Sequence, residues 1–191
     1  MKKINKGLIL TIIVVIALSM YIRNLEKQRE NEMPEIKEVC QEFITFIDKY
    51  SALPEEMQKL GEKIPENELE EYLKEMKAGL ESFIVSNEDA VNLQYQAFKT
   101  NLIKNNDETI LVKNQSRTIV VDECEFNGDK VTVKFNNKLR ITVKYLIEDE
   151  EVSESKTFWA PDDEIVLQKI EGEWKIVYSN LQDSGSTYFS D

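Results

Sequence analysis

The sequence contains no histidine and only two cysteines among its 191 residues. Without histidine it lacks the most common general base near neutral pH, the usual nitrogen ligand of zinc, and the usual partner of a serine or cysteine nucleophile. It also lacks the spaced acidic loop that wraps calcium and the glycine-rich loop that holds a nucleotide phosphate. From these absences we expect no catalytic centre, no cofactor and no metal site.

Basic side chains are scarce compared with acidic ones, 24 against 36, which gives a formal net charge of −12. Four of the basic residues lie within the first 23 positions, which contain no acidic residue, so the rest of the chain carries a charge of −16. Such a surface repels nucleic acids and anionic lipid headgroups. We therefore expect no nucleic-acid partner, whereas a basic partner is allowed and a well-solvated surface is the simplest interpretation.

The longest apolar run, GLILTIIVVIALSMYI over residues 7–22, follows a lysine-rich tip, residues 1–6. As a helix it would extend about 24 Å, slightly less than a hydrocarbon core about 30 Å thick. We interpret it as a transmembrane signal anchor with the tip in the cytoplasm, since positively charged flanks stay there. The prediction places the chain in the cell membrane as a single-pass protein with its C-terminal domain extracytoplasmic.

A cleaved signal peptide is the alternative interpretation of the same run. Its one candidate cleavage site, Ala17-Leu18-Ser19, is poor because the apolar residues continue past it to Ile22. A lipoprotein is excluded, because no cysteine near the end of the run could carry the lipid.

Helical periodicity dominates the first half of the remaining chain. Residues 23–33 are polar and predict a juxtamembrane spacer, for which a helical conformation stays open. Pro34 is suited to the first position of an amphipathic helix over residues 34–50. Pro54 and Pro65 begin two further helical segments, and a fourth follows to about residue 102. Three or four helices are therefore expected before the strands.

From residue 109 the apolar period changes from 3.6 to 2, which is typical of strands. Asn127-Gly128 and Gly172 mark hairpin turns, Asn136-Asn137 a bulge, and Pro161 an edge or corner between strands at 152–159 and 164–170. Helices followed by hairpin-linked strands predict an α+β domain over residues 34–180, with helices packed on one face of a curved antiparallel sheet. Residues 181–191 are predicted to form a flexible tail.

The two cysteines fall at apolar-face positions, Cys40 in a predicted helix and Cys124 in a predicted strand. Two interpretations stay open for them. The favoured one is that both are small buried hydrophobic residues, and the other is a disulfide formed in an exported domain.

The stretch EIVLQKIEGEWKIV, residues 164–177, resembles the closing hairpin of the nuclear transport factor 2-like (cystatin-like cone) superfamily. The arrangement over residues 34–180 is similar to the domain that precedes putative amidase domains in exported proteins of Gram-positive bacteria. The resemblance implies a cone-like sheet and helices that enclose a pocket. It implies no single function, because members include enzymes, ligand binders and assembly modules.

Catalytic members of the superfamily use an acidic residue inside the cone, and Asp122 is the best candidate here because it shares a strand face with Val120 and Cys124. Four aromatic residues could line such a pocket: Tyr145, Trp159, Trp174 and Tyr178. Aromatic residues in strands usually pack in a core, however, so this pocket is the less favoured hypothesis.

The sequence therefore predicts a membrane-anchored, extracytoplasmic, non-catalytic binding or assembly module of bacterial cell-envelope, secretion or sporulation machinery. We expect a protein partner or a second copy of the chain as its target. The alternative is a small-molecule-binding cone or a weak enzyme, in which Asp122 and a tyrosine move a proton; the ligand would be unknown.

Overall fold

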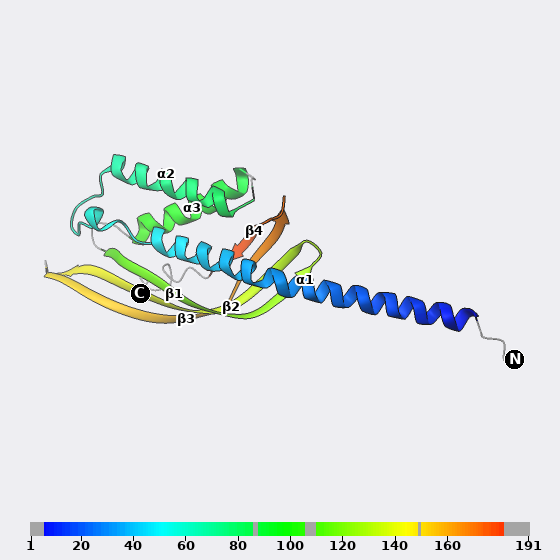
Figure 1. Cartoon of the computed structure of the whole chain (residues 1–191). Helices are drawn as coiled ribbons and strands as arrows, with labels where there is room; N and C mark the ends of the chain where they lie inside the picture. Colours follow the sequence, from blue (N-terminus) through cyan, green and yellow to red (C-terminus); the bar gives the residue numbers. More distant parts are fainter. Residues whose placement is uncertain (1–5, 86–87, 106–109, 149, 182–191) are drawn as a thin grey trace. The chain divides into compact units, whose positions relative to one another are not determined.

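The computed structural model describes residues 6–85, 88–105, 110–148 and 150–181, except for the side chains of residues 6–9, 88–90, 93, 104–105 and 160–162. Within these described ranges, helices come first and four strands follow (Figure 1). The elements are α1 Lys6–Tyr50, the 3-10 helix η1 Glu55–Met57, α2 Glu66–Phe83, α3 Glu88–Asn105, β1 Ile110–Asn127, β2 Lys130–Ile147, β3 Glu150–Ile170 and β4 Glu173–Asn180. The predicted α+β class is confirmed.

Two compact units divide the chain, residues 1–38 and residues 39–191. The first unit consists of the N-terminal part of α1. The prediction that a helix begins at Pro34 is wrong, because α1 is helical from Lys6 and passes through Pro34 without ending. Residues 23–33 are rich in Glu, Gln, Arg and Lys, which lose little side-chain freedom in a helix, and Gln28 donates a hydrogen bond to Glu32 one turn later.

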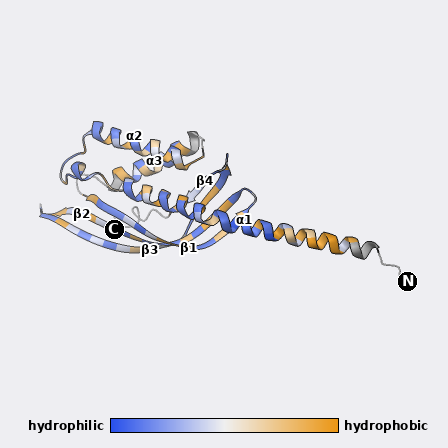
Figure 2. Cartoon of the chain, in the orientation of Figure 1, coloured by the Kyte–Doolittle hydropathy of each residue, from blue (hydrophilic) through white to orange (hydrophobic). Residues whose placement is uncertain are grey.

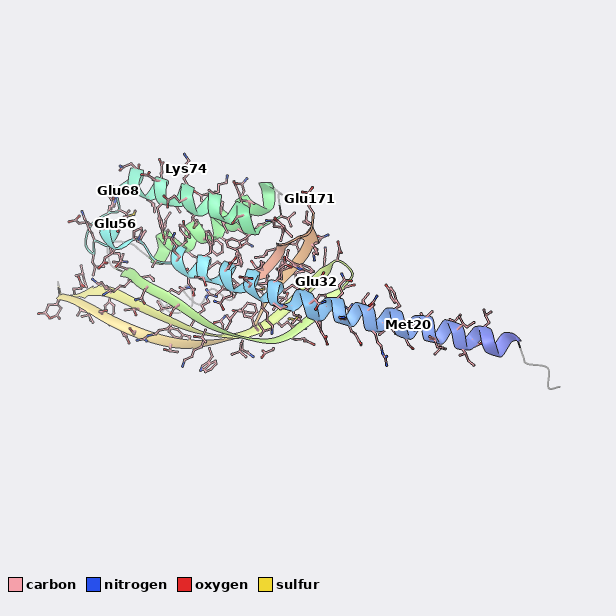
Figure 3. The ribbon with its side chains drawn as sticks, viewed as in Figure 1. Met20, Glu32, Glu56, Glu68, Lys74 and Glu171 are labelled. Atoms are coloured by element: carbon pink, nitrogen blue, oxygen red, sulfur yellow. The ribbon has the colours of Figure 1, made fainter. Side chains whose placement is uncertain are left out.

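The first unit exposes apolar side chains on every side of its helix. All ten large hydrophobic residues from Leu10 to Ile22 are 49–67% exposed, and Figure 2 shows them as an orange stretch of α1 that gives way to blue residues. The Met20 side chain projects away from the helix in Figure 3. Among residues whose side chains are described, no helix is both long and apolar enough to cross a membrane. The predicted span over residues 7–22 includes residues 7–9, whose side chains lie outside that description.

In the second unit, aromatic residues join the end of α1 to α2. The Phe46 ring lies 4.7 Å from the Tyr50 ring and 5.4 Å from the Phe83 ring, and Tyr50 lies 5.0 Å from Tyr72. The Tyr72 hydroxyl donates to the carbonyl of Ala52 at 2.8 Å, which satisfies a backbone acceptor just beyond the end of α1. These residues belong to, or pack against, a hydrophobic core cluster that also includes Leu102 and Leu111.

Gly79 of α2 leaves the space that the Phe46 ring occupies. An alanine Cβ at this position would overlap Cε2 of Phe46 and lie 2.9 Å from its Cζ. We expect Gly79→Ala to lower the free energy of unfolding by about 1–2 kcal/mol, because the cost of overpacking exceeds the gain in helix propensity. Urea unfolding followed by circular dichroism would measure it. Glu70→Ala, at an exposed position of the same helix, is the control, and a stabilised Gly79→Ala variant would contradict the close contact.

The four strands form one antiparallel sheet in the order β1-β2-β3-β4. The predicted turns at Gly128 and Gly172 are confirmed, both with positive φ, and the predicted bulge appears as a register shift between Phe135 and Asn137. One strand prediction is wrong in extent. β3 continues through residues 160–163, because a register shift there sets residues 161 and 162 of β3 against the single residue 136 of β2 and accommodates the irregularity.

Alternation along β2 separates the two faces of the sheet. Its buried positions are Val131, Val133, Phe135, Asn137, Leu139, Ile141 and Val143. Leu139, Ile141 and Val143 form a core cluster with Ala52, which follows α1, so this inner face is the one that the helices of the second unit cover (Figure 1). The predicted packing of helices on one face of the sheet is therefore confirmed. The positions between them belong to the opposite, outer face, because successive strand residues point to opposite sides.

Candidate interaction surface

The outer face of the sheet carries a patch that is both basic and aromatic. We call it the outer patch and define it by seven exposed residues from three strands: Ser116, Thr118, Val120, Lys138, Arg140, Thr157 and Trp159. The strand register sets them side by side. Lys138 of β2 lies opposite Thr118 of β1 and Trp159 of β3, while Arg140 lies opposite Ser116 and Thr157.

Burial of the inner face fixes this patch in its exposed position. Leu139 and Ile141 are 1% and 3% exposed, and they alternate with Lys138 and Arg140. A slip of one residue in the register would bury the two cations and expose the leucine and isoleucine. The same hydrophobic pattern that builds the core therefore also determines which side chains the outer face presents.

Trp159 is the most prominent member of the outer patch. Its side chain is 71% exposed, and the Nζ atom of Lys138 lies 5.7 Å from the centre of the ring. Val120 on β1 is also 59% exposed. Exposed tryptophan and arginine are the residue types that contribute most binding energy in protein interfaces. The patch therefore combines two apolar side chains with two cations, all held in place by the strand register.

The two cations of the outer patch have no acidic partner within the described ranges, in contrast to the lysines before and after them in β2. Lys134 contacts Glu123 at 3.2 Å and Glu125 at 3.4 Å, and hydrogen bonds to these carboxylates raise the pKa of Lys134. Lys144 contacts Glu151 at 2.7 Å. Among the described residues, Lys138 and Arg140 have no ion pair. A locally positive surface thus lies on a chain whose net charge is −12.

Asp122 lies in β1 at the register shift between Val121 and Glu123, where its exposed carboxylate accepts a hydrogen bond from Nδ2 of Asn136. It borders a cavity of about 400 Å³, whose lining residues are Asp122, Glu123, Lys134, Phe135 and Glu164. None of the four aromatic residues predicted beside Asp122 lines this cavity. Its walls are mainly charged, and one aromatic ring contributes.

The structure distributes the four aromatic residues over the sheet. Tyr145 packs against the Leu139 cluster and donates to Glu154 at 3.4 Å, and Trp174 is 5% exposed, with Lys169 5.5 Å from its ring. Tyr178 and Trp159 are exposed. Alternation along β3 could have predicted the outer position of Trp159. Trp159 shares alternate positions with Ser153, Ser155 and Thr157, whereas Val152 and Phe158 occupy the positions that point to the opposite face.

The two cysteines are thiols, and no disulfide joins Cys40 to Cys124, both of which the structure describes. Cys40 is fully buried and Cys124 is partly buried. Burial, with a smaller contribution from Cys124, raises the pKa of Cys40 to about 12. The reactive thiolate is therefore scarce at neutral pH, and Cys40 behaves as a packing residue. Within the described ranges, no group of acidic or cysteine side chains is arranged to hold a metal ion.

No protein-family model and no curated protein sequence matches the chain. Among solved structures, the crystal structure of the intermembrane space region of chloroplast protein ARC6 is similar, with 9% sequence identity and a TM-score of 0.41. The similarity covers 80% of this chain and 93% of that chain. At this level we base no argument on it. The resemblance to the cone superfamily, seen in residues 164–177, likewise stays a prediction.

Proposed function

We propose that this protein is a membrane-anchored, non-catalytic binding and assembly module whose outer patch binds an acidic segment of a protein partner. The observation that carries the proposal is the 71% exposed Trp159 beside Lys138 and Arg140. In this proposal the anchor holds the second unit on the extracytoplasmic side of a bacterial envelope, in cell-envelope, secretion or sporulation machinery.

The anchor is supported by the exposed apolar surface of α1. Residues 12–16 are five consecutive large hydrophobic side chains, each 49–57% exposed, and at 100° per residue they surround the helix. A helix that is apolar on all sides is stable when a nonpolar medium surrounds it. Charged side chains become frequent from Arg23 onward, where we place the membrane boundary.

The chemistry of the outer patch defines its partner. Two cations without counterions favour carboxylates, and Trp159 on β3 and Val120 on β1 offer apolar contacts on either side of β2. An acidic segment that carries a large apolar side chain satisfies both requirements. A second copy of this acidic chain meets the same description, so self-association is one outcome that the experiment below distinguishes.

Trp159→Ala is expected to weaken partner binding by roughly 30-fold or more, as for an interfacial tryptophan worth at least 2 kcal/mol. A photo-cross-linking residue at position 118 of the full chain in cells would identify the partner, and titration of the purified pair would give its Kd. Tyr178→Ala removes another exposed aromatic residue of the sheet, at 50% exposure, and serves as the matched control.

Charge reversal at Lys138 and Arg140 should abolish the same cross-link, and raised salt should weaken binding of the unmodified chain. A cross-link to the chain itself identifies a homo-oligomer. Equal affinity in the Trp159→Ala and Tyr178→Ala variants would contradict the outer patch as the binding surface, whichever partner is captured.

A further inference from the structure

A buried arginine forms the floor of a small cavity between the helices and β1. The side chain of Arg117 in β1 is 2% exposed, and its Nε atom donates to Oδ1 of Asp48 at 3.0 Å. Gln115 donates to the same oxygen from Nε2 at 2.9 Å. Among the described residues, Nη1 of Arg117 has no hydrogen-bond partner although it is fully buried. A buried donor of a charged group is costly to leave unsatisfied.

Arg117 lines this cavity together with both polar and apolar residues. Its polar wall consists of Ser51, Asn101 and Gln115, and its apolar residues include Ile47, Phe98, Leu102 and Leu181. The volume is about 30 Å³. One water requires about 10–15 Å³ by the same kind of measure, so the space suits a group of two or three heavy atoms.

Charge balance favours a neutral group in this cavity. Asp48 already compensates Arg117, so an incoming carboxylate would leave a net negative charge in a buried place. Burial of an uncompensated charge costs far more than a hydrogen bond to Arg117 returns. The group must instead be uncharged and must present an acceptor to Nη1.

The polar wall supplies the complementary acceptors. The Ser51 hydroxyl donates to the carbonyl of Ile47 at 2.7 Å, so its oxygen can only accept a further hydrogen bond. Gln115 directs Nε2 to Asp48, and its carboxamide oxygen is likewise an acceptor. A ligand group therefore needs an acceptor for Arg117 and a donor for Ser51 or Gln115. A carboxamide has both within three heavy atoms.

We propose that the Arg117 cavity is a binding site for a neutral carboxamide group, with the carbonyl oxygen on Nη1 of Arg117 and the NH₂ on Ser51 or Gln115. The group belongs to a small amide or to an Asn or Gln side chain of a peptide. The site is independent of the outer patch, which lies on the other face of β1.

Saturation-transfer NMR on the full chain in detergent micelles would test the site with acetamide as the probe. We expect saturable acetamide binding, weaker binding of acetone, which lacks the donor, and no binding of acetate. Arg117→Lys keeps the positive charge but removes Nη1, and should weaken acetamide roughly 10- to 100-fold. Arg23→Lys, at an exposed arginine that belongs neither to this cavity nor to the outer patch, is the matched control and should leave acetamide binding unchanged.

Ser51→Ala keeps the proposal testable if Arg117→Lys does not fold, since it should weaken acetamide and leave acetone unaffected. The tripeptide Gly-Gln-Gly distinguishes the source: tighter binding than acetamide assigns the site to a peptide, and exclusion assigns it to a small molecule. Absence of saturable acetamide binding would mean that the cavity holds water only. That result, or acetate binding as tightly as acetamide, would overturn the proposal.

Discussion

Replacing Arg117 with methionine should lower the free energy of unfolding by about 3–5 kcal/mol near pH 8, the largest stability effect that we expect in the second unit. Arg117 is the cation nearest the buried Asp48, whose side chain is 10% exposed. Methionine fills a similar volume but leaves the carboxylate without its compensating charge. Chemical denaturation of the full chain in detergent, followed by tryptophan fluorescence, would measure the loss.

The double variant Asp48→Asn/Arg117→Met is the decisive control. It removes both charges, so it should recover most of the stability that the single Arg117→Met variant loses. Arg140→Met removes an exposed arginine and should have little effect. If Arg117→Met and the double variant lose the same amount, the cost lies in packing rather than in the unpaired carboxylate.

The pH dependence of this effect has a definite sign. Burial raises the pKa of Asp48 above its ordinary value, and Arg117 and the hydrogen bond from Gln115 oppose that rise. Protonation of Asp48 therefore stabilises the folded state. This stabilisation is fully present below the pKa that Asp48 has in the unfolded chain, and it is lost as pH rises through the higher pKa that Asp48 has in the folded chain. Arg117→Met removes the opposing charge, so the folded pKa should rise further. The stability gap from the unmodified chain should narrow as pH falls from 8 to 4.

The double variant Ile13→Asp/Val14→Asp should prevent the chain from remaining in a membrane. Ile13 and Val14 are 57% and 49% exposed near the middle of the apolar run. Each central acid costs about 2.5–3.5 kcal/mol on insertion scales, so two together should release the protein or block its export. Fractionation of cells, with protease added to protoplasts, would show the loss of the accessible, membrane-bound form.

The double variant Asn24→Asp/Gln28→Asp in α1 is the matched control. It adds the same charge to a segment that is already polar, so the chain should stay bound. A reporter that is active only outside the cytoplasm, fused after residue 191, tests orientation independently. If the unmodified chain fractionates as a soluble cytoplasmic protein, the anchor and the proposed extracytoplasmic function are both wrong.

Local signals predicted the hairpins well. Gly128 and Gly172 have positive φ, and each lies between strands of clear alternation, so turn chemistry and period agree. Pro34 was misleading, since proline is favoured in the first turn of a helix and usually kinks or breaks one in its interior, yet α1 continues through it, and the polar residues before it have high helix propensity. Register shifts in neighbouring strands, such as the one opposite Pro161, depend on pairing that no single strand reveals.

The candidate sites were less predictable because they depend on which face each residue occupies and on distant pairing. Residue type predicted a core position for Trp159, or a pocket as the less favoured hypothesis, whereas the alternation of β3 places it on the outer face. The contact between Arg117 and Asp48 joins residues 69 positions apart, and neither position has a distinctive local motif. Only the packing of α1 against β1 brings these charges together.

That separation along the chain has a consequence for synthesis. At roughly 5–20 residues per second, Arg117 leaves the ribosome about 3–14 seconds after Asp48. During that interval the apolar side chains of Phe43, Ile44 and Ile47, all buried in the finished fold, have no sheet to cover them. The second unit therefore completes its core only after β1 and β2 have emerged, so these apolar side chains stay uncovered by the sheet for several seconds in the nascent chain.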